Sequence, residues 1–413
     1  MHAEGVSLEA VAAEVGTPAY VYSAATLRRH ARVLREALDG HAETTGALIA
    51  FAVKANSNLS VLRVLAGEGL GADTVSEGEI RRALAAGIAP DKIVFSGVGK
   101  TDAELAFAIR AGVLEINVES AAELDRLIAV AAGLGARPDI VFRVNPRVGS
   151  GAHAKITTGG ARDKFGAPVE EVMALYARAA ASNHVRPVGL ACHIGSQITE
   201  LSPLKAAFAV LRQMTLDLRA QGFDVHRLDF GGGLGVPYFD RPGEADPVDY
   251  AAVAAEAARG LDVQLAFEPG RMIAANAGVL LTRVIHVNAR PDGMRFLVLD
   301  SAMNDLMRPA LYDAFHDLRP VRPREGAEGP YDVVGPVCET GDTFARDRVL
   351  PPLEAGDLAA FMTAGAYGAT MANEYNSRPL VPEVLVDGDR WAVVRARPTY
   401  DEMLAWEAVA GWL

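Results

Sequence analysis

The sequence predicts an α/β protein, in which a (β/α)8 barrel is followed by an antiparallel β domain. Between residues 47 and 270, eight short apolar runs alternate with longer segments of helical pattern, which is the element order of a parallel barrel. After about residue 276, strand-like runs follow one another with turn residues and no capped helices between them. We expect the barrel at 24–275 and the β domain at 276–413, with residues 1–23 joining the β domain. A doubly wound open sheet is the alternative for the first part.

The eight apolar runs are the predicted barrel strands. Runs that are apolar on both faces are typical of a parallel sheet buried on both sides. The segments between them are expected to be helices that return the chain to the same end of the sheet. The runs are 47–53, 72–75, 92–96, 115–118, 139–144, 189–194, 227–230 and 264–267.

Three of the predicted helices carry a recognisable start. In each, a Ser or Thr is followed three residues later by Glu, so that hydroxyl and carboxylate can satisfy the free backbone donors of the first turn. We expect the first and third of these helices to end at Gly87 and Gly133. The pairs are Ser76 with Glu79, Thr101 with Glu104, and Ser120 with Glu123.

The remainder of the chain is predicted to be β structure. Asp387-Gly388 is a hairpin signal between two strand-like halves. Residues 316–330 are rich in polar residues, proline and glycine, and are expected to form a loop. The strand-like segments are 277–289, 294–303, 331–338, 357–367 and 383–398.

Composition and charge narrow the class of protein. The chain has 413 residues, with 40 Lys and Arg against 52 Asp and Glu, a net charge of −12. This excess of acid disfavours nucleic acid and anionic membranes as partners. No apolar run reaches the roughly 18 residues that span a bilayer, and the N-terminus lacks a secretory pattern. Two cysteines cannot form a disulfide framework, so we expect a cytoplasmic enzyme of metabolism.

Polar side chains follow the ends of several predicted strands. Barrel enzymes place their active sites at the carboxyl ends of the strands, so a barrel would bring these side chains to one mouth. We therefore take this group as the candidate active site. Its members are Lys54, Asp73, Arg143, His193, Glu268 and Arg271.

Lys54 is the most informative of these residues, since a charged lysine is costly to bury at the end of an apolar strand. It either extends to the mouth of the barrel or provides an amine that forms a Schiff base with a carbonyl cofactor. The glycine run at 231–235 can bring backbone N–H groups close to a phosphate, although a tight turn explains it equally well. Val236 breaks the dinucleotide-binding pattern. A phosphate loop, a Schiff-base lysine and a carboxylate are the parts that hold pyridoxal phosphate.

Six motifs in order carry a resemblance. They are AVKAN around Lys54, HIGSQ from His193, GGGLG from Gly231, EPGR at 268–271, CETGD at 338–342 and GAYG at 365–368. Together they resemble the alanine-racemase-fold, pyridoxal-phosphate-dependent decarboxylases, over nearly the whole chain from residue 16 to 379. The resemblance implies the same barrel and β domain.

The resemblance also implies pyridoxal 5′-phosphate as the cofactor and gives each motif a role. Lys54 would hold the cofactor covalently, His193 would stack on the ring face, and Glu268 would pair with the pyridine nitrogen. Further cofactor contacts would come from Asp73, Arg143, Ser196, Gly231, Gly232, Gly233, Gly270, Arg271 and Tyr367. Substrate contacts would come from Arg271, Arg308, Tyr312, Glu339 and Tyr367. Met272 departs from the commoner pattern, where a small polar residue follows EPGR, and puts one minor contact in doubt.

Cys338 is the expected proton donor, because a thiol is a competent acid near neutral pH. With Lys54 and His193 it completes the expected catalytic set. Cys192 lies within an apolar run and is expected to be core. In the family, the residues corresponding to Cys338 and Glu339 reach the active site of a neighbouring subunit, so the resemblance implies a homodimer with shared sites.

The expected reaction is decarboxylation of meso-diaminopimelate to L-lysine and CO2. An arginine fork suits the distal carboxylate of this substrate and an acidic side chain suits its distal ammonium, roles that Arg308 and Glu339 can fill. The alternatives are decarboxylation of another basic amino acid or of carboxynorspermidine, and a non-catalytic relative that only binds a partner. No metal is expected.

Overall fold

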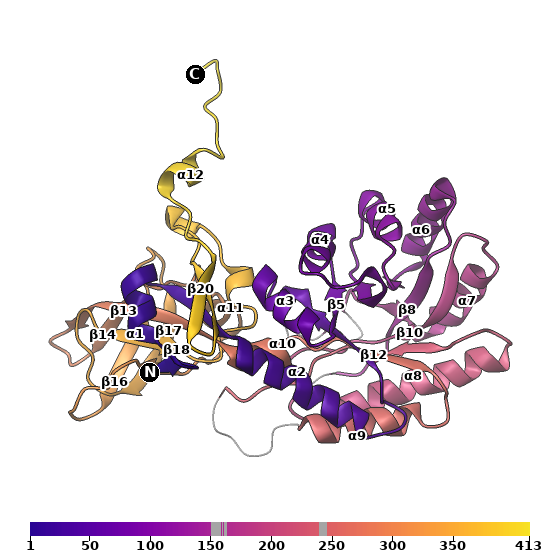
Figure 1. Cartoon of the computed structure of the whole chain (residues 1–413), viewed down its shortest axis with the longest axis horizontal. Helices are drawn as coiled ribbons and strands as arrows, with labels where there is room; N and C mark the ends of the chain where they lie inside the picture. Colours follow the sequence, from indigo (N-terminus) through magenta and orange to yellow (C-terminus); the bar gives the residue numbers. More distant parts are fainter. Residues whose placement is uncertain (150–157, 159, 161–162, 239–245) are drawn as a thin grey trace. The chain divides into compact units, whose positions relative to one another are not determined.

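The structure is a computed structural model that describes residues 1–149, 158, 160, 163–238 and 246–413. The chain forms two compact units (Figure 1). The barrel unit contains Leu27–Ile273, and the β unit combines Met1–Thr26 with Ala274–Leu413. The domain limits expected from the sequence remain a prediction. Among the described residues, no helix has the length and apolar character to cross a membrane.

The barrel unit is a closed ring of eight parallel strands, as the sequence predicts. The strands follow the order β10-β11-β12-β4-β5-β6-β7-β8, and pairing of β8 with β10 closes the ring. This closure excludes the open doubly wound sheet. Each predicted run overlaps one strand, and the two-residue β9 (Ala167–Pro168) adds a parallel pairing to β8. The ring strands are β4 (Leu48–Ala52), β5 (Gly71–Thr74), β6 (Ile93–Phe95), β7 (Glu115–Val118), β8 (Asp139–Asn145), β10 (Arg186–Ala191), β11 (Arg227–Asp229) and β12 (Gln264–Phe267).

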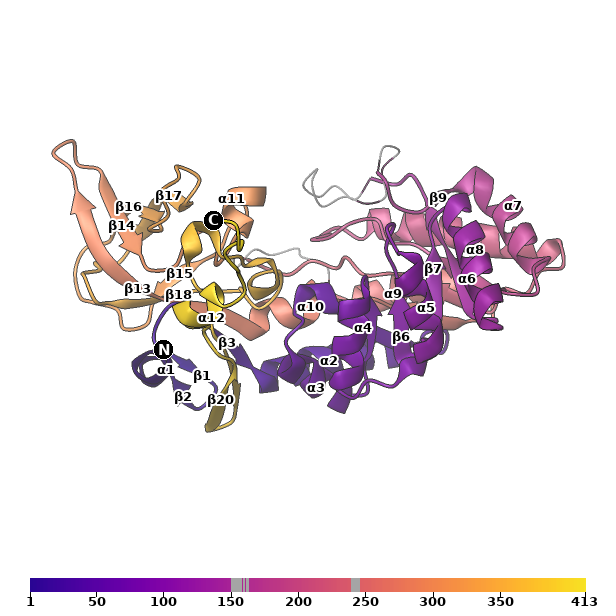
Figure 2. The same ribbon diagram turned by 90° about the horizontal axis from the view of Figure 1, so that it is seen from above.

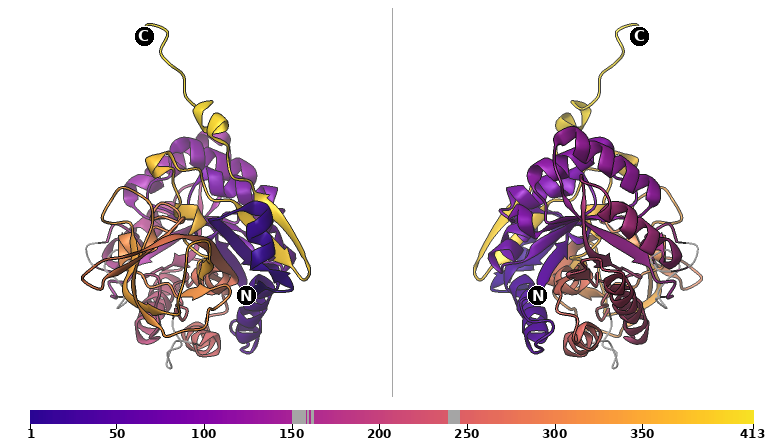
Figure 3. Two further views of the ribbon diagram at one scale, coloured as in Figure 1. Left: turned by 90° about the vertical axis from the view of Figure 1, so that its left-hand side faces the viewer. Right: turned by 90° about the vertical axis from the view of Figure 1, so that its right-hand side faces the viewer.

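Helices lie along the outside of this ring, as the right-hand view of Figure 3 shows. Large apolar side chains such as Phe95, Phe142 and Phe230 are fully buried between the layers. This packing makes the ring a solid core rather than a pore. The helices are α2 (Ala24–Asp39), α3 (Leu59–Gly67), α4 (Glu77–Ala85), α5 (Asp102–Ala111), α6 (Ala121–Leu134), α7 (Val169–Ala180), α8 (Ser202–Ala220), α9 (Pro247–Ala258) and the short α10 (Arg271–Ala274).

The three predicted helix starts are correct, but only one is a full capping box. Thr101 accepts a hydrogen bond from the backbone N–H of Glu104, whose carboxylate accepts from that of Thr101. In α4 and α6 the glutamate instead accepts from the residue before the cap, Val75 or Glu119.

The predicted end of α6 at Gly133 is wrong. The helix continues to Leu134, and Gly135 takes the left-handed conformation at φ +61° that ends it. The other predicted end is correct, since Gly87 takes φ +87° just past α4. Two glycines two residues apart both suit a helix end, and the sequence alone does not decide between them.

The β unit is built around the long strand β13 (Gly278–Ala289). β13 pairs antiparallel with β3 (Ala19–Ser23), β14 (Arg295–Leu299) and β18 (Leu358–Phe361), and Figure 2 shows β13, β14 and β16 side by side. Pairing of β3 ties the N-terminal segment into this unit. The other elements are β1 (His2–Ala3), β2 (Val6–Ser7), α1 (Leu8–Val15), α11 (Arg308–Tyr312), β15 (Leu318–Pro320), β16 (Gly329–Val334), β17 (Thr343–Leu350), β19 (Glu383–Asp387), β20 (Arg390–Arg395) and α12 (Tyr400–Leu404).

The β unit departs from the sequence prediction in three respects. The pairs β14–β16 and β3–β19 are parallel within an otherwise antiparallel sheet. β17 carries three consecutive charged residues, Arg346–Arg348, and is partly exposed, and no strand was predicted there. β15 lies in the segment 316–330 that was expected to be a loop, and pairs there with β18.

Candidate active site

Lys54 and Asp73 form an ion pair at the carboxyl ends of adjacent strands. Lys54 sits in a short 3-10 turn (Val53–Ala55) directly after β4, and Asp73 pairs in register with Ala52. The Lys54 Nζ atom lies 2.9 Å from Asp73 Oδ2, and its side chain is 38% exposed while that of Asp73 is fully buried. The amine is thus held at the mouth of the barrel by a buried carboxylate.

Glu268 lies directly after β12 and is buried. Its backbone N–H donates to the Gly231 carbonyl at 2.8 Å, and Ser96 Oγ donates to its Oε1 at 3.5 Å. Burial, and next the charge of Asp229, raise the pKa of Glu268 well above its usual range. Burial beside a second carboxylate therefore favours the protonated form of the Glu268 carboxyl.

His193 is partly buried, and its hydrogen bonding favours the neutral form. Its Nδ1 accepts a hydrogen bond from the Gly232 backbone N–H at 3.1 Å, so the ring proton lies on Nε2. Burial first, and then the positive charges of Lys54 and Arg143, lower the pKa of His193 well below its usual range. A neutral, fixed imidazole is suited to stacking on a flat ring.

At the glycine run, the backbone packs closely against the backbone of neighbouring strands, so the glycines do more than form a tight turn. A Cβ added to Gly232 would lie 2.0 Å from the Glu268 carbonyl oxygen, and one added to Gly231 would lie 2.3 Å from that of Cys192. Gly231 and Gly233 also take φ of +64° and +110°. These positions have no space for a side chain, so the backbone itself lines this part of the mouth.

Arg143 is held by Glu119, a residue that the sequence analysis did not select. Arg143 Nη1 lies 3.1 Å from Glu119 Oε1, and both side chains are largely buried. Glu119 also accepts from the backbone N–H groups of Gly97 and Gly166. These three charge-assisted contacts fix the Glu119 carboxylate, which in turn holds the Arg143 guanidinium at the end of β8.

Arg271 lies at the start of α10 and contacts Ser196. Its Nη2 donates to Ser196 Oγ at 3.0 Å, and its guanidinium lies 5.9 Å from the ring centre of Tyr238. Ser196 and Arg271, both expected near the cofactor, therefore lie together. Within the barrel unit, Lys54 is thus ion-paired with Asp73, and hydrogen bonds join His193 to Gly232 and Arg271 to Ser196.

Gly270 lies in the barrel unit between Glu268 and Arg271, and the other expected site residues belong to the β unit. Cys338 and Glu339 are exposed, and Glu339 interacts with Tyr375. The buried Arg308 donates to His316 Nε2 at 2.7 Å. Tyr312 is the last residue of α11. Cys192, expected to be core, is buried in the barrel unit.

Tyr367 has an unusual backbone conformation. It takes φ +56° although it is not a glycine. The flanking Gly365 has no room for a side chain, since an added Cβ would lie 2.1 Å from the Ala274 carbonyl oxygen. Strain of this kind persists only where the surroundings impose it, and it concentrates at functional positions.

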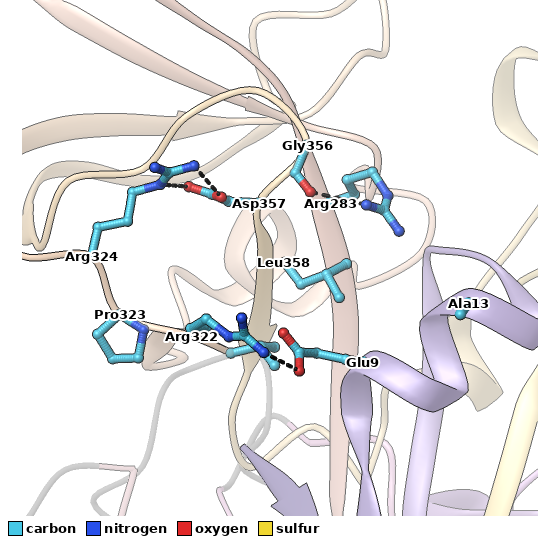
Figure 4. Close-up of a pocket in the computed structure, with 10 residues that line it drawn as sticks. Glu9, Ala13, Arg283, Arg322, Pro323, Arg324, Gly356, Asp357 and Leu358 are labelled. Atoms are coloured by element: carbon cyan, nitrogen blue, oxygen red, sulfur yellow. Dashed lines mark hydrogen bonds and ion pairs between the residues drawn. The ribbon is translucent and has the colours of Figure 1, made fainter.

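A surface pocket of about 510 Å³ in the β unit is lined by three arginines (Figure 4). Arg322 pairs with Glu9 at 2.9 Å and Arg324 with Asp357 at 2.7 Å. Arg283 donates to the Gly356 carbonyl at 2.9 Å. Because carboxylates match most of this charge, the pocket does not compete with the barrel mouth as an anion site.

Three polar residues of the mouth were missed although a signal was present. Ser96 ends the third predicted run, and Glu119 directly follows the fourth. The rule that selected Lys54 would have selected both had it been applied to every strand. Asp229 lies inside the seventh run, where it interrupts an apolar pattern.

The comparisons with known proteins agree with this geometry. Residues 24–275 match the family model described as the pyridoxal-binding domain of pyridoxal-dependent decarboxylases. The diaminopimelate decarboxylase of Zymomonas mobilis is 46% identical over 411 residues, which cover 99% of this chain and 97% of that relative. The corresponding enzyme of Pseudomonas aeruginosa is 48% identical over 99% and 97% of the two chains. The chain belongs to the pyridoxal-dependent decarboxylase family.

Solved structures of this decarboxylase family share the whole fold. Diaminopimelate decarboxylase from Helicobacter pylori, complexed with L-lysine, is 40% identical, with a TM-score of 0.92 over 96% of this chain and 98% of that one. The enzyme from M. jannaschii, also in complex with L-lysine, is 35% identical, with a TM-score of 0.93 over 99% and 96%. The predicted barrel with its β domain and the recognised family are thereby confirmed.

Proposed function

We propose that this decarboxylase converts meso-diaminopimelate to L-lysine and CO2 with pyridoxal 5′-phosphate as cofactor. The observation that carries the proposal is the Lys54–Asp73 ion pair at the barrel mouth. The same mouth holds Glu268 and the closely packed backbone of Gly231–Gly233, which we call the glycine cradle. The relatives at 46% and 48% identity are diaminopimelate decarboxylases over nearly their whole length. Two solved relatives hold L-lysine, the product of this reaction.

The residues of the mouth fit the cofactor chemically. Lys54 offers an amine for a carbonyl carbon, and the tight backbone at Gly231–Gly233 suits a phosphate. Asp73 Oδ1 is buried and has no hydrogen-bond partner among the described residues. A buried acceptor without a partner is costly, and a polar ligand would remove that cost.

Each residue then has a task that its own chemistry supports. When bound, pyridoxal phosphate supplies an electron-accepting ring that stabilises negative charge on Cα after CO2 leaves. Lys54 would anchor the cofactor, and Glu268 would hold a proton at its pyridine nitrogen. His193, neutral and fixed by Gly232, would cover one ring face and exclude water from it. Asp73, Arg143, Ser196, Gly270 and Arg271 are proposed as further cofactor contacts.

The β unit is proposed to supply the substrate-binding groups. Arg308 would bind the distal carboxylate and Glu339 the distal ammonium, as their opposite charges allow. Cys338 would hold the proton that Cα receives, and its exposure leaves the thiol accessible. Tyr312 and the strained Tyr367 are proposed as further contacts, with Tyr367 touching cofactor and substrate.

A homodimer with shared active sites is part of the proposal. It is supported by the last residues of the chain, which follow α12 as an extended segment (Figure 1) and carry exposed large apolar side chains. Trp406 is 69% exposed and Trp412 is 88% exposed. Such side chains clustered on one segment are typical of an association surface. Sedimentation equilibrium is the direct measurement.

The test of the function is a substrate panel. Purified protein with pyridoxal 5′-phosphate is incubated with meso-diaminopimelate, ornithine, arginine and carboxynorspermidine, and CO2 and amine products are assayed. We expect the highest kcat/KM with diaminopimelate, with L-lysine as the product. A higher kcat/KM for another member of the panel would show that this compound is the substrate. If protein with bound cofactor forms no product from any of them, decarboxylation is rejected.

A further inference from the structure

Asp229 is a second buried carboxylate beside Glu268. It ends β11, and in the parallel register it pairs with Ala266 on β12, two residues before Glu268. The two strand ends are joined by Phe230 N to Ala266 O at 3.0 Å and by Glu268 N to Gly231 O at 2.8 Å. Asp229 is fully buried. The fold therefore places two acidic groups next to each other in the core of the barrel.

One oxygen of Asp229 has a structural task and the other does not. Oδ1 accepts the Gly231 backbone N–H at 2.7 Å, which helps to set the first glycine of the cradle. Oδ2 is buried, and among the described residues it has no hydrogen-bond partner as long as both carboxyls are ionised; a protonated Glu268 carboxyl would donate to Asp229. A carboxylate used only to fix a turn would not need a second, unsatisfied oxygen in the core, since an asparagine could accept the same bond.

The buried carboxyls of Asp229 and Glu268 have too little positive charge around them to stabilise two negative charges. Burial raises the pKa of Asp229 to about 6, and burial together with the charge of Asp229 raises that of Glu268 well above its usual range. Two adjacent buried carboxyls do not both ionise easily, so the pair retains a proton. The ionisable and polar groups facing the pair are Lys54, Asp73, Ser96, Arg143, Cys192 and Tyr250.

We propose that Asp229 is a positioning residue for the proposed reaction: its buried negative charge keeps a proton on Glu268 and, once a pyridine ring is bound, keeps that ring nitrogen protonated. The proton leaves the Glu268 carboxyl and goes to the ring nitrogen, or to solvent when the ring arrives already protonated. Asp229 itself exchanges no proton with the ring. This inference rests on the proposed function, since it concerns the residue that faces the cofactor nitrogen.

The test uses Asp229→Asn, which removes the charge but keeps an oxygen for the Gly231 N–H. Pyridoxine 5′-phosphate is the probe, because it has the pyridine ring and phosphate but no aldehyde, so Lys54 cannot react with it. The absorbance of the bound probe reports protonation of the ring nitrogen, and the full-length protein is titrated with base. The matched control is Glu115→Gln, which removes another fully buried carboxylate at the opposite end of the barrel strands.

We expect the bound ring nitrogen of Asp229→Asn to lose its proton about 1 to 3 pH units lower than in the wild type, which is the effect of a unit charge about 4 to 10 Å away at an effective dielectric constant of 20. Glu115→Gln should leave this titration unchanged. An unchanged titration in Asp229→Asn would overturn the inference, as would an equal shift in both variants. Failure of the wild type to bind the probe at all would instead count against the proposed cofactor.

A measurement on the wild type keeps the inference testable if Asp229→Asn does not fold. In the cofactor-free protein near neutral pH, infrared spectroscopy should detect the carbonyl stretch of a protonated carboxyl. Binding of pyridoxine 5′-phosphate should remove that band, because the stored proton leaves Glu268. A spectrum in which no such band is lost on binding would show that Glu268 gives up no proton to the ring or to solvent, and it would overturn the inference.

Discussion

Replacement of Gly232 by alanine tests the cradle through steric contact alone. An added Cβ would lie 2.0 Å from the Glu268 carbonyl oxygen and 2.9 Å from its carbonyl carbon. Both atoms are backbone, so no side chain can rotate away. Gly232 does not take a positive φ, and alanine therefore meets no conformational obstacle there other than this contact.

The size of the effect follows from that distance. Real Cβ contacts essentially never fall below 3.0 Å, so the strand end that carries Glu268 must retreat by about 1 Å, a displacement that can cost about 10²-fold when it misplaces a reacting group. Overpacking of this kind also destabilises by about 1–3 kcal/mol. We therefore expect Gly232→Ala to raise the Kd for pyridoxal 5′-phosphate about 10²-fold and to lower the free energy of unfolding by that amount.

The assay is urea unfolding of the cofactor-free protein together with titration of the cofactor by absorbance. The control is Gly133→Ala in α6, where nothing lies within 4 Å of the added Cβ. This change should leave the Kd unchanged and stabilise the protein by up to about 1 kcal/mol, the usual gain for alanine over glycine in a helix. Wild-type affinity and stability in Gly232→Ala would refute the reasoning.

Three further predictions concern single residues. Lys54→Ala should abolish the absorbance band of covalently bound cofactor while the protein stays folded, and a retained band would mean that another lysine carries the cofactor. Cys338→Ala should lower kcat by about 10²–10⁴-fold, the range of general-acid groups, and a near-normal rate would remove the thiol from the mechanism. Burial raises the pKa of Glu115 from 4.5 to about 7, so its contribution to stability is full below pH 4.5 and is lost as the pH rises through 7. Between pH 4.5 and 7, the wild type should therefore lose about 3 kcal/mol of unfolding free energy relative to Glu115→Gln. If the unfolding free energies of the two proteins instead change in parallel with pH, the raised pKa of Glu115 is contradicted.

Local sequence patterns were sufficient for the barrel because its strands are apolar on both faces and its helices carry caps. Both signals are set by neighbouring residues, as at Thr101 and Glu104. The β unit was harder to predict, because β17 contains the charged run Arg346–Arg348 and pairs at the edge of its sheet. The parallel pairing of β3 with β19 joins residues more than 300 positions apart, and no local pattern records it.

The residues proposed for the site came from the order of the motifs, but the buried carboxylates that contact them, Glu119 and Asp229, were not predicted. Lys54 with Asp73, and Ser196 with Arg271, lie together as expected. Glu119 contacts Arg143, and Asp229 is proposed to act on Glu268. Contacts of this indirect kind depend on three-dimensional packing, which no local sequence pattern records. A motif shows which side chains reach the mouth, whereas only coordinates show what holds them.

The central claim is that Lys54 carries the cofactor at the mouth that holds Glu268. Reduction of the protein with borohydride in the presence of pyridoxal 5′-phosphate, followed by peptide mapping, measures this attachment directly. We predict a single phosphopyridoxyl label on Lys54 and loss of the visible absorbance. A label on Lys100 or any other lysine, with Lys54 unmodified, would contradict the account.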